Sequence, residues 1–162
     1  RYYKVTGVQT CALPISWLDF EEFRAALPGA RESYLAQDFA QTSRRLENAL
    51  ELYRGDFAEN FQDLWTDLPR HEHSKELPEL YLLLCHSERA QKRYGAAEIA
   101  ARKGLQQEPF GEELHLALME VLLAQGRKAE ALRHYRQALA ELERELGHYP
   151  RCFDDIFARI IV

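Results

Sequence analysis

The stretch that decides the fold is GRKAEALRHYRQALAEL, residues 126–142. Its apolar residues recur one, three and four positions apart: Ala131, Leu132, Tyr135, Ala138, Leu139 and Leu142. This spacing draws one apolar stripe along a helix, and the small alanines on it let a neighbouring helix approach closely. Because a lone helix cannot bury such a stripe, the pattern predicts a helix pair that recurs along the chain.

The same pattern does recur 34 residues earlier. The matching pairs are Ala97 with Ala131, Leu105 with Leu139, and Leu84 with Leu118. A fourth pair, Glu88 with Leu122, does not match. The two copies, 81–109 and 115–143, each hold an apolar helix, a break and an Ala-rich amphipathic helix. This period resembles the tetratricopeptide repeat. The chain departs from it at Lys92, where the turn glycine would fall, and at Gly104, where a small alanine is usual.

Composition is that of an ordinary globular domain. The chain has 162 residues, 46% of them hydrophobic and 29% charged, which fits one domain with a real core. Its net charge of −5 argues against direct binding to a nucleic-acid backbone. No apolar run approaches the roughly 20 residues that span a bilayer. The three cysteines are scattered without a CxxC pair, which indicates a reducing cytoplasm and neither a disulfide framework nor a zinc site.

The first residues are expected to be foreign to the natural protein. VTGVQTCALPIS, residues 5–16, resembles a common sequencing adapter translated in one frame. We therefore expect residues 1–16 to be a non-native segment, and exclude them from the fold. On that reading, the natural sequence before Trp17 is missing.

From Trp17 onward every segment indicates a helix, so the predicted class is all-α, a superhelix of antiparallel helix pairs. A helix is predicted over 17–27, stopped by Pro28 and Gly29, and another within 31–54. Pro69 suits the first turn of the next helix, and Pro78 indicates a kink or a restart. Four helices are predicted near 79–92, 95–107, 112–125 and 127–146, with Gly126 and Gly147 at the last two ends. Residues 151–162 are predicted to form a terminal capping helix.

The order of motifs resembles one family, the bacterial transcriptional activation domain of Streptomyces antibiotic regulatory protein type regulators. The closest pieces are ALELYRGDF (49–57), EPFGEELHLALMEVLLAQGRKAEALRHY (108–135) and LERELGHYP (142–150). The resemblance covers 17–150, with repeats clearest at 78–146. It implies a module that follows an N-terminal winged-helix DNA-binding domain and takes part in dimerisation or regulation. In physical terms these motifs are architectural: Pro109 ends a helix, and Phe110 is expected to fill the corner.

Catalytic and metal chemistry find little support. His71 and His73 are two residues apart and diverge on a helix, and Cys85 on an apolar stripe is a small buried hydrophobe. Glu112-x-x-His115 has the spacing of a metal motif but needs carboxylates from other helices. The sequence therefore predicts no enzyme, no cofactor and no metal, and only convergent carboxylates around His115 would revive a helical metal-dependent enzyme.

A partner groove is the stronger candidate site. In stacked helix pairs the first helix of each pair lines the concave face. The expected lining is Glu79, Leu82, His86, Arg89, Glu113, Leu116, Glu120 and Leu123. Being mostly Leu and Glu, it suits another helix or a neighbouring domain better than an acidic peptide C-terminus. The chain's own terminal helix could equally fill it.

The function favoured by these features is a regulatory, protein-interaction module of a bacterial transcriptional regulator. Its partners would be proteins: its own second copy, an adjacent domain or a partner helix. DNA would be reached only through a domain absent from this chain, and no membrane is involved. The alternative is a free-standing helical-repeat scaffold that binds a peptide or a partner helix.

Overall fold

The computed structural model describes residues 17–52, 67–147 and 150–161, and side chains within 25–51, 76–147 and 150–161. The described residues form seven α-helices and contain no strand, which confirms the all-α prediction. The helices are α1 (Trp17–Leu35), α2 (Phe39–Leu52), α3 (Asp67–Ala90), α4 (Tyr94–Gln107), α5 (Glu112–Ala124), α6 (Lys128–Leu146) and α7 (Phe153–Ile161). Residues 1–16 and 53–66 lie outside the described part.

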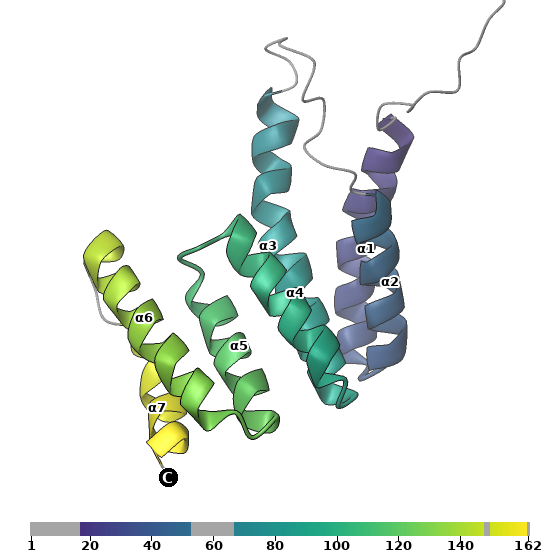
Figure 1. The fold of residues 1–162 in the computed structure, drawn as a ribbon. Coiled ribbons are helices and arrows are strands. Elements are labelled where there is room, and N and C mark those ends of the chain that lie inside the picture. Colours follow the sequence, from purple (N-terminus) through teal and green to yellow (C-terminus); the bar gives the residue numbers. More distant parts are fainter. Residues whose placement is uncertain (1–16, 53–66, 148–149, 162) are drawn as a thin grey trace, which may run out of the picture.

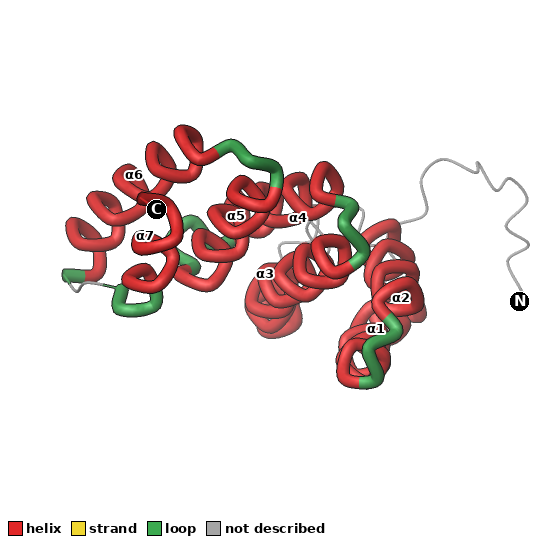
Figure 2. Tube along the Cα trace, turned by 90° about the horizontal axis from the view of Figure 1, so that it is seen from below, coloured by secondary structure: helices red, strands yellow, loops and turns green. Residues whose placement is uncertain are grey.

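The helices pack as successive antiparallel pairs, α1 with α2, α3 with α4 and α5 with α6 (Figure 1). Each first helix also contacts the first helix of the next pair, so α1 meets α3 and α3 meets α5. Viewed from below, the pairs follow one another across the molecule (Figure 2). One core of buried side chains runs through all of them, which is the arrangement that a repeated apolar stripe requires.

The same turn joins the two helices of each pair. At its tip the backbone adopts the left-handed conformation, with φ of 59° at Gln37, 62° at Lys92 and 75° at Gly126. In each turn the tip residue's N–H donates to the carbonyl three residues back, and the next N–H to the carbonyl five residues back, all at 2.9 Å. This pattern caps the last turn of the first helix. Lys92 therefore adopts the left-handed conformation for which the tetratricopeptide repeat has a glycine at this position.

Aligned on these turns, the pairs are equivalent residue by residue. Five residues after the tip, Ala97 and Ala131 are both fully buried, as the 34-residue period predicted, and Thr42 occupies the same place in α2. The first pair is thus a third copy, beyond the two that the sequence revealed. Its tip precedes Lys92 by 55 residues and not 34, because residues 53–66 and a longer α3 intervene.

The terminal helix α7 continues the same period. Ala30, Cys85, Met119 and Phe153 occupy one position of the four first helices, and each is fully buried. α7 packs on α5 and α6 in the way that α5 packs on α3 and α4. Of its large apolar side chains, Phe153, Ile156 and Ile160 are buried, whereas Phe157 and Ile161 remain on the outside. α7 is therefore the first helix of a further unit.

Two boundary predictions were wrong, and both concern proline. α1 does not stop at Pro28 but runs through it to Leu35, because Leu27 and Ala30 on either side are buried in the core. α3 begins at Asp67 and continues through Pro78, so Pro78 marks no restart. Burial of the flanking turns outweighs the single backbone hydrogen bond that each proline removes. Pro69 lies in the first turn of α3, as predicted.

Gly104 on α4 has a packing reason. A Cβ at this position would lie 2.6 Å from Leu114 Cδ2 and 3.1 Å from Tyr81 Cβ. Because α3, α4 and α5 meet here, the glycine lets the three helices approach more closely than an alanine would. The buried residues at the same position of the other pairs are also small, Ala49 and Ala138.

Candidate functional site

The eight residues predicted to line a groove lie on two adjacent helices. Four are on α3 and four on α5, the first helices of the second and third pairs. They are related by the 34-residue period, so Glu79 corresponds to Glu113 and Leu82 to Leu116. We call the face of α3 and α5 that carries these eight residues the α3/α5 groove. Six of the eight line two separate cavities on it: Glu79, Leu82 and Glu113 in one, and Arg89, Glu120 and Leu123 in the other.

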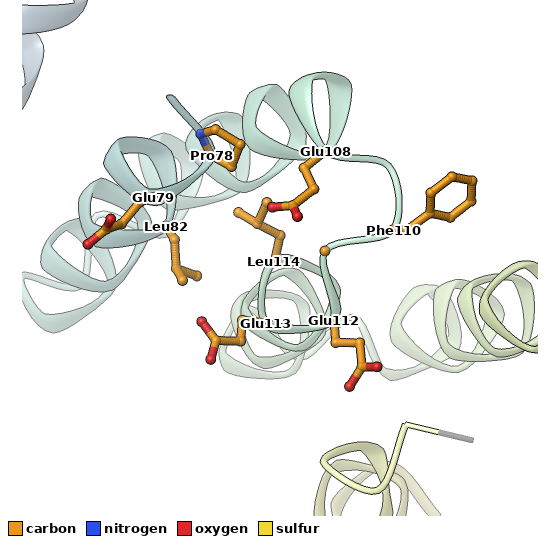
Figure 3. Close-up of a pocket in the computed structure, with 9 residues that line it drawn as sticks. Pro78, Glu79, Leu82, Glu108, Phe110, Glu112, Glu113 and Leu114 are labelled. Atoms are coloured by element: carbon orange, nitrogen blue, oxygen red, sulfur yellow. The ribbon is translucent and has the colours of Figure 1, made fainter. Parts of the chain in front are cut away.

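The first cavity, of about 390 Å³, is acidic. Glu79 and Leu82 reach it from α3, and Glu112, Glu113 and Leu114 from the start of α5, as Figure 3 shows. Glu108 adds a fourth carboxylate from the end of α4. Glu79 also accepts a hydrogen bond from Arg31 Nε of α1 at 2.9 Å, and Glu112 accepts one from the Cys152 thiol at 3.5 Å.

Phe110 does not fill the corner between α4 and α5, as the sequence had suggested. Its side chain is 41% exposed and points away from the other labelled residues in Figure 3. Leu114, which is buried, closes the space between α4 and α5 in its place. The cavity consequently stays open beside a corner that carries an exposed aromatic ring.

The second cavity, of about 700 Å³, is basic at its rim. Arg89 of α3, Lys128 of α6 and Arg159 of α7 surround a single carboxylate, that of Glu120 on α5. Arg89 pairs with one oxygen of Glu120, and Arg159 Nη1 pairs with the other at 3.1 Å. Three cations around one anion leave net positive charge, above a floor of Leu123, Ala124 and Ala158.

The stretch between the two cavities carries His86 and Leu116, both half-buried. Burial lowers the pKa of His86, and the guanidinium of Arg89 lowers it further, while Glu113 opposes the change. The imidazole is therefore neutral near pH 7. The groove thus combines an acidic end, a neutral and partly apolar middle, and a basic end.

The terminal helix does not fill this groove. Among the described helices α7 contacts α5 and α6, and it reaches the groove only at its basic end, through Arg159 and Ala158. Sequence reasoning missed Lys128 and Arg159 as lining residues because they belong to helices outside the two that the period compares. It also missed Glu108, which follows the end of α4.

His115 takes part in a buried chain of hydrogen bonds. Its Nε2–H donates to the carbonyl oxygen of Pro109 at 2.9 Å, so its Nδ1 accepts from His134 Nε2 at 3.0 Å. Burial lowers the pKa of both imidazoles, that of His134 to about 4. Two neutral histidines therefore tie α5 to α6 and to the preceding corner. His134 escaped the sequence analysis because nothing in its spacing links it to His115.

Two further features concern the titratable side chains of the described residues. No group of three or more His, Cys, Asp or Glu side chains that could hold a metal ion occurs among them. Burial raises the pKa of the Cys85 thiol to about 11, which keeps it protonated and unreactive. The side chains of His71 and His73 lie outside the described set. None of the helices in the described ranges is long and apolar enough to cross a bilayer.

Comparison with known proteins identifies one family. The sequence model described as the bacterial transcriptional activator domain matches residues 18–152, most of the chain. The matched span contains α1 to α6 almost entirely and ends just before α7. No curated protein and no solved structure matches the chain.

Proposed function

The chain belongs to the bacterial transcriptional activator domain family, and from this premise we propose that it is the regulatory, protein-interaction module of a transcriptional regulator. In this proposal it acts in the cytoplasm on an N-terminal winged-helix DNA-binding domain encoded upstream of Trp17. The action is through contacts between domains or between protomers. The adapter-like residues 5–16 stand where that domain would join.

The observation that supports this proposal is the charge pattern of the α3/α5 groove. An acidic cavity and a basic cavity lie at its two ends, with the half-buried His86 and Leu116 between them. Such a surface suits a helical or extended protein segment whose own charges run in the opposite order. A partner segment would bury Leu82, Leu116 and Leu123, while the charged ends would fix its direction.

Recovery of the natural gene is the first test. A winged helix encoded immediately upstream of Trp17 supports the proposal. Its absence favours the alternative of a free-standing scaffold, which would use the same groove for a peptide and have no link to transcription.

Charge reversal in the recovered regulator is the second test. The variants Glu113→Lys and Lys128→Glu each reverse the charge at one end of the groove, and Arg144→Glu, at an exposed position of α6, is the matched control. We expect the groove variants to change promoter-DNA affinity, measured by fluorescence anisotropy, by about 5- to 50-fold. Groove variants that match both wild type and control would refute the proposed contact.

A further inference from the structure

Glu88 on α3 is a buried carboxylate that is only half satisfied. The residue is 1% exposed, and its Oε1 accepts a hydrogen bond from Arg93 Nη2 at 2.5 Å. Its Oε2 is buried without a hydrogen-bond partner, and no other buried side-chain nitrogen or oxygen in the described set lacks one. An unsatisfied buried carboxylate oxygen is costly, so this position calls for an explanation.

The fold itself does not require a carboxylate there. The equivalent positions of the other first helices hold Ser33, Leu122 and Ile156, all buried. Ser33 donates its hydroxyl to the Gly29 carbonyl at 2.9 Å, and the other two side chains are apolar. A leucine at position 88 would therefore suit the repeat, and Arg93, whose side chain is 52% exposed, would be solvated without its partner. Packing does not account for Glu88.

Glu88 lines a third cavity, of about 420 Å³, between α2, α3 and α4. This cavity is on the α2 and α4 side of α3 and is separate from the α3/α5 groove. Its walls are largely apolar, with Leu50, Tyr81, Leu84 and Ile99 among them. Glu47 and Glu51 of α2 bring two further carboxylates, against the single cation of Lys103.

We propose that this cavity binds an ammonium or guanidinium group carried on an aliphatic chain, with Glu88 as the anion that holds it. The ligand's N–H groups would donate to Oε2 in a charge-assisted hydrogen bond, which is strong where water is excluded. The aliphatic stem would pack on the apolar walls, and Glu47 and Glu51 would attract the cation from outside. A divalent metal ion fits less well, because it needs several more oxygen ligands than these walls supply.

Two sources could present this chemistry, a free diamine or the side chain of Lys or Arg in a partner protein. Isothermal titration calorimetry of the chain with agmatine, and separately with the blocked peptide Gly-Gly-Arg-Gly-Gly, distinguishes them. Binding of agmatine indicates a small-molecule site. Binding of the peptide alone indicates a partner's side chain. Either result supports the proposal, provided that it depends on Glu88.

The matched variants are Glu88→Gln, Glu88→Leu and the exposed Glu143→Gln, which changes the net charge without touching the cavity. We expect roughly 10- to 100-fold weaker binding for Glu88→Gln, complete loss for Glu88→Leu and no change for Glu143→Gln. Glu88→Leu should also raise Tm by about 2–4 °C, so that its loss of binding is not a loss of folding.

Failure of both probes to bind wild type at millimolar concentration would overturn the proposal, as would equal binding by wild type and Glu88→Leu. If Glu88→Leu does not fold, the test rests on Glu88→Gln, and unchanged binding by Glu88→Gln would also overturn the proposal. The result is independent of the regulatory role, since the cavity and the α3/α5 groove share no lining residue.

Discussion

At the scale of single residues, the repeated helix pairs have the same backbone structure at the tip of the turn. Gln37, Lys92 and Gly126 share one left-handed conformation and one pair of capping hydrogen bonds, although only one of them is glycine. In this conformation a residue with a Cβ is sterically strained, whereas glycine is not. The 34-residue period revealed the copies with tips at Lys92 and Gly126, because Ala97 and Ala131 match. It did not reveal the copy with its tip at Gln37, because Thr42 stands where the alanine would be.

Replacing Lys92 with glycine is expected to stabilise the chain. The change removes the strain of φ at 62°, at some cost in the entropy of the unfolded chain, for a net gain of about 0.5–1 kcal/mol. Gly126→Ala should do the reverse, by about 1 kcal/mol, since its Cβ would meet nothing within 4 Å and strain alone would act. Urea unfolding midpoints measure both. Destabilisation by Lys92→Gly would show that the lysine side chain supports the turn.

The His115–His134 chain predicts a pH dependence of stability. Both pKa values are lowered in the folded state, so below about pH 6.5 the unfolded chain binds more protons than the folded one. Stability should thus be complete above that pH and fall as the pH drops toward 4. In His134→Gln the side-chain amide N–H can still donate to His115 Nδ1, but the new side chain does not take up a proton as the pH falls. Wild type should therefore lose about 1–2 kcal/mol more than His134→Gln between pH 7 and pH 5, measured by urea unfolding. If wild type and His134→Gln lose the same unfolding free energy, protonation of His134 does not cause the loss.

At the scale of elements, periodicity predicted which segments are helices better than where they begin. The four helices from 79 to 146 were located to within one or two residues, except for the start of α3. Their apolar stripes are regular because each of these helices packs against neighbouring helices on both sides. Prolines misled the assignment of α1 and α3, since local propensity at Pro28 and Pro78 is overridden by the burial of neighbouring turns. The rule that a proline ends a helix fails where flanking turns are packed.

The terminal helix offers a direct test of element packing. Phe153 is fully buried against Tyr135, with ring centroids 5.9 Å apart, whereas Phe157 stacks on Tyr135 at 4.8 Å but is 36% exposed. Phe153→Ala should cost about 3–4 kcal/mol and Phe157→Ala about 1 kcal/mol, measured by thermal or urea unfolding. Similar small costs for both would mean that α7 does not belong to the cooperative stack.

At the scale of the whole molecule, the described helices form a row of equivalent units that share one core, and the cavities lie between units. The sequence predicted the α3 and α5 sides of the groove because the 34-residue period relates them. It could not predict the basic end, where Lys128 and Arg159 join from α6 and α7, nor the cavity at Glu88, which needs α2, α3 and α4 together. Sites built by several helices depend on how those helices stack, which spacing within one helix does not encode.

We propose that the α3/α5 groove is the surface through which this module contacts the rest of its regulator. Hydrogen–deuterium exchange, compared between the chain alone and the full regulator, tests it most directly. We expect slower exchange in peptides covering 79–89 and 113–123, with α4 and the part of α6 that follows its first turn unchanged. Protection confined to 94–107 and 132–146, or no difference between the two proteins, would contradict the proposal.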